Sequence, residues 1–169
     1  MDMPPVSPQI PNSRAAILSA LAADLPGGGL ISDPVELKAY ECDGLSAYRC
    51  PPLAVTLPRT TAQVAAILKT CHRLRVPVVP RGAGTSLAGG ALPTADCVVL
   101  GVARLTRVIE VNLADRFIHV ETGRTNLSVT GAVEDEGFFY APDPSSQIAC
   151  AIAGNIAMNS GGAHCLKYG

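Results

Sequence analysis

The chain has 169 residues, of which 48% are hydrophobic and 16% charged, and its formal net charge at pH 7 is −1. This composition is apolar enough to bury a core and excludes an intrinsically disordered chain. The small net charge argues against a nucleic-acid-binding surface, which needs clustered Lys and Arg. No apolar run reaches the roughly 18 residues of a membrane-spanning helix. The length fits one domain, or one domain and part of a second.

The N-terminal residues MDMPPVSPQIPNS lack the charged-then-apolar order of a secretory signal, so they predict a short proline-rich leader. The chain contains 6 cysteines, with no CxxC pair and no zinc-type His/Cys spacing. We therefore expect reduced cysteines in a cytoplasmic protein and no metal site. Cys71 and Cys97 lie inside apolar runs and are expected in the core.

Three helices are predicted from their start signals in the first half of the chain. Ser13 precedes a helix-forming run that ends at Pro26. Asp33 is followed by a first-turn proline and by a glutamate three positions after the cap, which is typical of a helix start. Thr60, with a glutamine three positions later, begins a third helix whose apolar spacing buries one face.

Short β-branched runs predict strands over residues 53–58, 76–80, 97–102, 107–112 and 116–121. Residues 112–115 are expected to turn a hairpin between the last two strands. Residues 125–137 are predicted to be helical despite Gly131, with Gly137 ending the helix. This order of elements predicts an α+β fold with small mixed sheets.

The glycine-rich stretch PRGAGTSLAGGALP follows the predicted strand 76–80 and has the composition of a phosphate-binding loop. It is not a Walker-type loop, because it contains no lysine. It is not a Rossmann fingerprint, because another apparent strand follows it in place of a helix. A loop that offers its own N–H groups to a diphosphate fits best, with hydroxyls from Thr85 and Ser86. A plain turn between strands remains the alternative.

A second stretch, residues 140–169, is dense in small uncharged residues, and Asp143 is the only charge between Ala141 and Ala163. Such a segment packs its backbone against a flat ligand, with Asn155 and Asn159 as amide donors. A close helix contact through small residues is the alternative. We expect main-chain amides from both stretches to meet at one diphosphate.

The motifs PRGAGTSLAGGALP, APDPSSQ, AGNIAMNSGG and LKYG together resemble the FAD-binding domain of the vanillyl-alcohol oxidase/p-cresol methylhydroxylase superfamily. Within it the sequence is most similar to glycolate oxidase D-subunits and FAD-linked D-lactate dehydrogenases. The resemblance begins near Asp33 and includes YECDGLSAY. It implies a PCMH-type fold of two small α/β subdomains that hold FAD, over residues 33–92 and 93–169, after a leader and helix in residues 1–32. The second subdomain would be incomplete.

The same resemblance implies three groups of cofactor-binding residues. Those around the diphosphate would be Arg81, Gly82, Ala83, Gly84, Thr85 and Ser86. Those along the flavin or its ribityl chain would be Pro142, Asp143, Ser145 and Ser146. Those lining the dinucleotide would be Gly154, Asn155, Asn159, Ser160, Gly161 and Gly162. Thr85 occupies the position of the histidine that carries covalent flavin in some members, so non-covalent FAD is expected.

The sequence departs from the family pattern at Ala153, where relatives have a glycine, and it ends at Gly169, so we expect an N-terminal fragment. The implied reaction is oxidation of a 2-hydroxy acid, glycolate or D-lactate, to the 2-oxo acid. The base and the substrate clamp are expected beyond Gly169, and no catalytic residue is assigned. His72 and His119 are interpreted as structural, which leaves His164 as the one histidine to test.

Three interpretations remain open. The chain is the FAD-binding part of a 2-hydroxy-acid dehydrogenase, a flavin-binding module without catalysis, or an unrelated domain whose glycine loops merely turn. The family's partners, an iron–sulfur subunit and other oxidase subunits, are expected only for a full-length protein. That protein is expected to be cytoplasmic and to lie at the inner membrane through these subunits, and no nucleic acid is expected as a partner.

Overall fold

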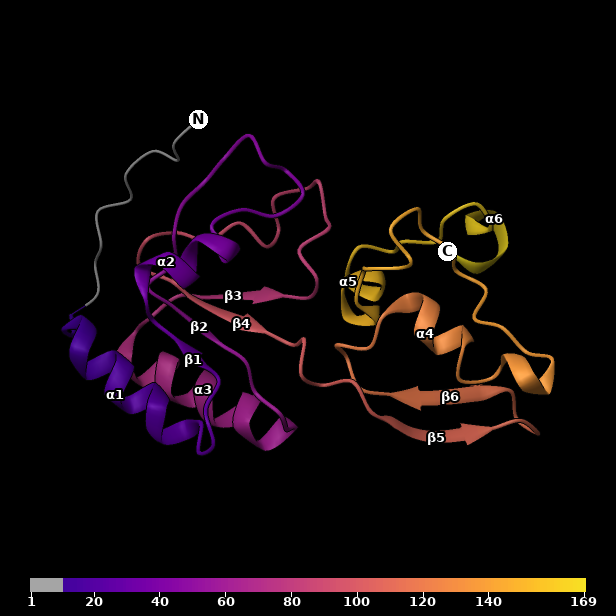
Figure 1. Ribbon diagram of the computed structural model, residues 1–169, viewed down its shortest axis with the longest axis horizontal. Helices are drawn as coiled ribbons and strands as arrows, with labels where there is room; N and C mark the ends of the chain where they lie inside the picture. The colour runs from indigo at the N-terminus through magenta and orange to yellow at the C-terminus, as the bar shows by residue number, and fades with distance from the viewer. Residues whose placement is uncertain (1–10) are drawn as a thin grey trace. The chain divides into compact units, whose positions relative to one another are not determined.

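The computed structural model describes residues 11–169 and divides the chain into two compact units, Met1–Val102 and Ala103–Gly169 (Figure 1). Most of the predicted leader lies outside the described residues. The first unit extends past the predicted boundary at residue 92, because the strand that follows is paired inside its sheet. Whether the two units correspond to two FAD-binding subdomains stays a prediction.

The first unit is built on a mixed four-stranded sheet with the strand order β1-β2-β4-β3. Its strands are β1 (Leu30–Ile31), β2 (Ala54–Thr56), β3 (Val78–Arg81) and β4 (Val98–Gly101). β4 runs parallel to both β2 and β3, and β1 is antiparallel to β2. The prediction of small mixed sheets is confirmed. β1 was not predicted, since two residues are too few to show a period.

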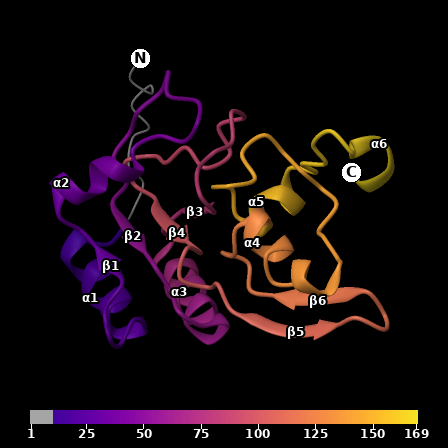
Figure 2. The same ribbon diagram turned by 45° about the vertical axis from the view of Figure 1, so that its right-hand side comes forward.

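Helices cover both faces of this sheet, because neighbouring residues of a strand point to opposite sides. α1 (Arg14–Asp24) and α3 (Thr61–Leu74) lie side by side on one face (Figures 1 and 2). α2 (Pro34–Leu37) and the 3₁₀ turn η1 (Lys38–Tyr40) contribute to the core on the other face. The buried residues of the first core are Ile17, Leu21, Leu25, Leu53, Ala54, Ile67, Cys71, Val76, Val98 and Leu100. Those of the second are Leu37, Val55, Cys97 and Val99.

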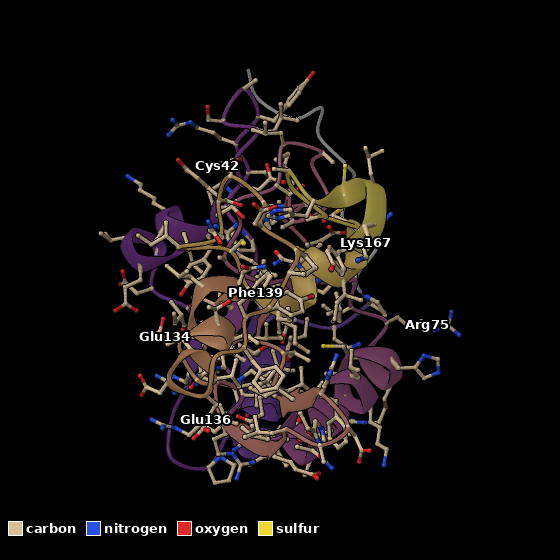
Figure 3. All side chains as sticks on the ribbon, turned by 90° about the vertical axis from the view of Figure 1, so that its right-hand side faces the viewer. Cys42, Arg75, Glu134, Glu136, Phe139 and Lys167 are labelled. Atoms are coloured by element: carbon tan, nitrogen blue, oxygen red, sulfur yellow. The ribbon has the colours of Figure 1, made fainter. Side chains whose placement is uncertain are left out.

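All three predicted helix starts in this unit are confirmed by cap hydrogen bonds. Ser13 Oγ accepts from the Ala16 N–H at 3.3 Å, and Asp33 Oδ1 accepts from the Val35 N–H at 2.8 Å. Thr60 Oγ1 accepts from the Gln63 N–H at 3.2 Å. Each such cap stabilises its helix by about 1 kcal/mol. α3 ends at Arg75, whose φ of 55° is left-handed and whose side chain points to solvent (Figure 3).

The second unit contains the predicted hairpin, formed by β5 (Val108–Asn112) and β6 (Phe117–Val120) in antiparallel pairing. Its turn is fixed because Asn112 Oδ1 accepts from the Asp115 N–H and Asn112 Nδ2 donates to Asp115 Oδ2, both at 2.9 Å. Short helices follow the hairpin: α4 (Asn126–Thr130), the 3₁₀ turn η2 (Glu134–Glu136), α5 (Ile152–Ala157) and α6 (Cys165–Tyr168).

The single helix predicted over residues 125–137 is wrong, because the chain forms α4, a turn and η2 there. Gly131 caps α4, as expected of a residue that destabilises a helix interior by about 1 kcal/mol. Gly137 ends η2 with a φ of 77°. Within residues 11–169, no helix combines the length and apolar character that crossing a membrane would require.

We predict that Ile67→Ala destabilises the first unit by about 2–5 kcal/mol, because Ile67 is 0% exposed between α1 and the sheet. The neighbouring Leu68 is 45% exposed and serves as the matched control. Leu68→Ala should change stability by about 0.5 kcal/mol or less. Urea unfolding followed by circular dichroism measures both, and equal losses would contradict this packing.

Candidate functional site

The glycine-rich loop leaves the carboxyl end of β3 and presents unpaired main-chain donors. Within the described part of the chain, the N–H groups from Gly82 to Leu87 have no hydrogen-bond acceptor. Gly84 has a φ of 74°, which an L-residue rarely adopts, and it lets the chain bend here. Successive free N–H groups in a bent segment form a concave site for an anion. The interpretation as a diphosphate loop therefore fits the geometry.

The loop packs against residues 40–45 of the same unit, which we call the backing segment. A methyl group built on Gly44 would lie 2.7 Å from the carbonyl oxygen of Thr85 and 2.8 Å from that of Ser86, so only glycine fits there. A Cβ built on Gly89 would lie 3.7 Å from Cδ2 of Leu45, so the two segments are also in contact there. Apart from the family resemblance, sequence analysis assigned no role to this segment. Gly44 was the one residue in this segment that could have indicated a close packing contact from the sequence.

The Arg81 side chain turns back onto the backing segment. Arg81 Nη1 donates a hydrogen bond of 2.6 Å to the carbonyl oxygen of Cys42, and its Cζ lies 5.5 Å from the ring centroid of Tyr40. Cys42 is marked in Figure 3. A methyl group on Gly84 would lie 2.5 Å from Arg81 Cζ, so the guanidinium also touches the loop's own bend.

Asp43 lies in the same segment and is 6% exposed. Its Oδ1 accepts from the Leu45 N–H at 2.9 Å. Its Oδ2 is buried and has no hydrogen-bond partner within residues 11–169. A buried oxygen in this state costs about 1–3 kcal/mol relative to a paired one.

In the second unit, Asp143 ties the APDPSSQ motif to the glycine pair near the C-terminal end. The Asp143 N–H donates to the Gly161 carbonyl at 3.3 Å, and Asp143 forms a parallel bridge with Gly162. Gly162 has a φ of 67°, and a Cβ there would overlap the main chain of Asp143. Pro142 is fixed beside it, because its carbonyl accepts from Asn126 Nδ2 at 3.0 Å.

The carboxylate of Asp143 also binds His164. Its Oδ1 accepts from the His164 N–H at 3.3 Å, and its Oδ2 lies 3.2 Å from His164 Nδ1. Desolvation raises the pKa of Asp143, but the His164 N–H and the imidazole charge outweigh it, so the pKa lies below its usual value. His164 thus has a structural contact with Asp143. A functional role for His164 beyond this contact stays to be tested.

The small-residue segment 154–162 differs from the loop after β3 because its main chain is largely paired. The N–H groups of Gly154 and Asn155 both donate to Ala151, and that of Ser160 donates to Asn155. Asn159 takes a left-handed φ of 51°. Asn155 is 5% exposed, and its Nδ2 is a buried donor that has no hydrogen-bond partner among the described residues. The side-chain amide of Asn155 is therefore a buried free donor of this segment.

Ala153, where the family resemblance leads us to expect glycine, is half-buried, and its N–H donates to the Thr122 carbonyl at 3.0 Å. The side chains of Ser145 and Ser146 are exposed and half-buried, respectively. The predicted residues thus form two groups, Arg81 to Ser86 in the first unit and Pro142 to Gly162 in the second. Their meeting at one diphosphate stays a prediction.

The cysteines predicted in the core are buried, with Cys71 at 2% and Cys97 at 0% exposure. Burial, with a contribution from Asp24, raises the pKa of Cys71 to about 11. Burial also raises the pKa of Cys97. Neither thiol is a ready nucleophile at neutral pH. His72 lies in the last turn of α3 and His119 in β6, as predicted.

The amino-acid sequence is similar to those of flavin enzymes. It is 53% identical over 156 residues to "Glycolate oxidase subunit GlcD" of Escherichia coli K12, which covers 92% of this chain and 31% of that protein. It is 42% identical over 130 residues to the GlcD subunit of Bacillus subtilis, covering 77% of this chain and 28% of that protein. It is 34% identical over 152 residues to the mitochondrial D-2-hydroxyglutarate dehydrogenase of Bos taurus, covering 90% and 28%. The chain thus spans about a third of the length of these relatives.

The fold is similar to those of two solved enzymes at low sequence identity. An alkyldihydroxyacetonephosphate synthase superposes with a TM-score of 0.83 at 18% identity, covering 99% of this chain and 34% of that one. Substrate-bound p-cresol methylhydroxylase superposes with a TM-score of 0.71 at 18% identity, covering 84% and 28%. These matches confirm the expected α+β fold of the PCMH type.

A family model described as "FAD binding domain" matches residues 52–169, which include both glycine-rich segments. The chain therefore belongs to this FAD-binding domain family.

Proposed function

We propose that this chain is the FAD-binding part of a flavin-dependent oxidoreductase that oxidises a 2-hydroxy acid, glycolate or D-lactate, to the 2-oxo acid. The observation that carries the proposal is the run of unpaired N–H groups from Gly82 to Leu87 in a chain of an FAD-binding family. The choice of substrate is supported by the relatives named as glycolate oxidase subunits and as D-2-hydroxyglutarate dehydrogenases.

The free donors fit the chemistry of FAD. N–H groups of the loop would hold the oxygens of the diphosphate, with the exposed hydroxyl of Thr85 beside them. Asn155 Nδ2 is a buried donor that lacks an acceptor among residues 11–169, and the flavin dinucleotide is rich in acceptors. When bound, FAD supplies the acceptor for the two electrons of the alcohol oxidation.

This chain's residues would act by binding and orienting. The structure shows Asp143 joined to Gly161 and His164, which fixes the APDPSSQ motif proposed to lie along the flavin or its ribityl chain. Thr85 in place of a flavin-linking histidine supports non-covalent FAD. We assign no base or substrate clamp within these residues and propose both for the remaining two thirds of a protein as long as the relatives.

The partners and location follow from the same proposal. The relatives named as glycolate oxidase subunits support further subunits, and we propose an iron–sulfur protein among them. We propose that the whole protein is cytoplasmic and that association with these subunits places it at the inner membrane. A flavin-binding module without turnover of its own is the second candidate.

We predict that the 169-residue chain binds FAD reversibly and binds it more tightly than riboflavin, because only FAD offers a diphosphate to the Gly82–Leu87 donors. Flavin fluorescence titration measures both affinities. Acid precipitation should release the flavin into the supernatant. Failure to bind FAD would contradict the proposed function, and flavin retained in the precipitate would contradict non-covalent binding.

Turnover separates the two candidates. The 169-residue chain with FAD should not reduce an artificial acceptor with glycolate or D-lactate, whereas a protein as long as the relatives should. Turnover by the short chain would refute our placing of the base outside it. A full-length protein that binds FAD but oxidises neither substrate would support the module.

We predict that Gly84→Ala lowers FAD affinity about tenfold or more, because the new methyl group displaces the Arg81 guanidinium and strains the bend. Gly137→Ala is the matched control, since Gly137 has a similar φ of 77° but open space around its Cβ position. Both variants should lose similar thermal stability. An equal loss of FAD affinity in the two would show that the effect is general destabilisation.

A further inference from the structure

We propose that Arg81 does not hold the diphosphate directly but braces the loop from the backing segment, so that Tyr40, Cys42 and Gly44 belong to the cofactor site as positioning residues. This inference rests on the proposed FAD binding and revises the role that the family resemblance implied for Arg81. It assigns the backing segment, residues 40–45, a function in binding.

The first step of the argument is that the guanidinium is already engaged on several sides. One nitrogen donates to the Cys42 carbonyl at 2.6 Å, a short distance for such a bond. The Tyr40 ring centroid lies 5.5 Å from Cζ, within the range of a cation–π contact. A methyl group on Gly84 would lie 2.9 Å from Nε and 2.5 Å from Cζ. The half-buried guanidinium thus contacts the ring, the carbonyl and the loop's bend.

The second step is that the loop has little internal support: the Ala88 N–H donates to Ser86 Oγ at 3.2 Å and the Leu92 N–H to the Gly89 carbonyl at 3.1 Å. Its N–H groups from Gly82 to Leu87 make no hydrogen bonds within the described residues, so they do not hold one another in place. A loop of this composition loses much conformational entropy when it becomes ordered. Arg81 and the close approach of Gly44 to the Thr85 and Ser86 carbonyls supply the missing constraint. A loop ordered before the ligand arrives binds it with less entropic cost.

The third step concerns chemistry. A planar guanidinium can donate to a carbonyl and stack on a ring at the same time, whereas a lysine ammonium is a compact point charge. If Arg81 acts as a brace, lysine cannot replace it. If Arg81 acts as a charge on the diphosphate, lysine replaces it in part.

The experiment compares R81K and R81Q for FAD affinity by fluorescence titration and for the midpoint of thermal unfolding without ligand. The brace predicts that both variants bind FAD about tenfold more weakly, with R81K no better than R81Q. It also predicts ligand-free unfolding midpoints that stay close to that of the unaltered chain. Binding by R81K that is clearly tighter than by R81Q would overturn the brace in favour of direct charge.

A double-mutant cycle with Y40L tests the link to the backing segment. The brace predicts that Y40L alone weakens FAD binding and that adding R81K weakens it little further, because both changes release the same guanidinium. Additive losses, or no loss in Y40L, would overturn the brace. Y40F retains the ring and should bind FAD like the unaltered chain, which keeps the test valid if Y40L folds poorly.

The matched control is R49K. Arg49 flanks the backing segment and pairs with Glu41 at 2.9 Å, with 59% of its side chain exposed. R49K should leave FAD affinity unchanged, and a loss equal to that of R81K would contradict a specific role for Arg81. If the unaltered chain fails to bind FAD, the proposed function itself is refuted. If it binds FAD and only the Arg81 and Tyr40 results disagree, the brace alone is refuted.

Discussion

The parallel pairing of β3 with β4 fixes the place from which the anion-binding loop departs. Val78 to Arg81 pair in register with Val98 to Gly101, and the hydrogen bond from the Val102 N–H to the Arg81 carbonyl, 3.0 Å long, is the last one before the loop. Beyond it, the N–H groups from Gly82 to Leu87 have no acceptor in the part of the chain that the structure describes. Ligands of α/β sheets commonly bind at the carboxyl ends of parallel strands, and this loop is at such an end. The core that holds α3 and the sheet together therefore also positions the site.

The loop offers an anion neutral donors in place of a row of cations. This agrees with a chain whose net charge is −1 and whose second glycine-rich segment carries one charge, Asp143, between Ala141 and Ala163. Neutral main-chain donors have little freedom to follow a ligand, so their value depends on how firmly the backbone is held. Contacts behind the loop are for this reason as important as the donors in front of it. Arg81, Tyr40 and Gly44 provide such contacts.

Local signals predicted much of the fold. Ser13, Asp33 and Thr60 marked helix starts because their side chains cap the first turn, an interaction that spans only a few residues. The hairpin was predictable for the same reason, since its turn is closed by Asn112 and Asp115. β1, which is two residues long, and α5, in a segment of small residues, carry no measurable period, so tertiary contacts alone define them.

The loop residues of the site could be predicted from the sequence, but the contacts that support the loop could not. Loop composition identified residues 81–86, because glycine and hydroxyl residues are themselves the signal. The contact of Arg81 with Cys42 could not be found in this way, because it joins a side chain to a carbonyl 39 residues away and any residue type supplies a carbonyl. Gly44 was visible as a glycine, but its reason, the carbonyls of Thr85 and Ser86 beside it, is a tertiary contact.

Arg81 in the first unit and Asp143 in the second each bind a main-chain group, but the two contacts differ in what they leave unpaired. In the first unit, the cation Arg81 binds a carbonyl oxygen and leaves the loop's N–H groups free. In the second, the anion Asp143 accepts from the His164 N–H, while the segment's N–H groups mostly pair with its own carbonyls. The first arrangement leaves donors for an anion, and the second leaves a buried amide donor at Asn155 that has no acceptor among the described residues. A dinucleotide that combines a diphosphate with a flat ring system offers acceptors to both kinds of donor.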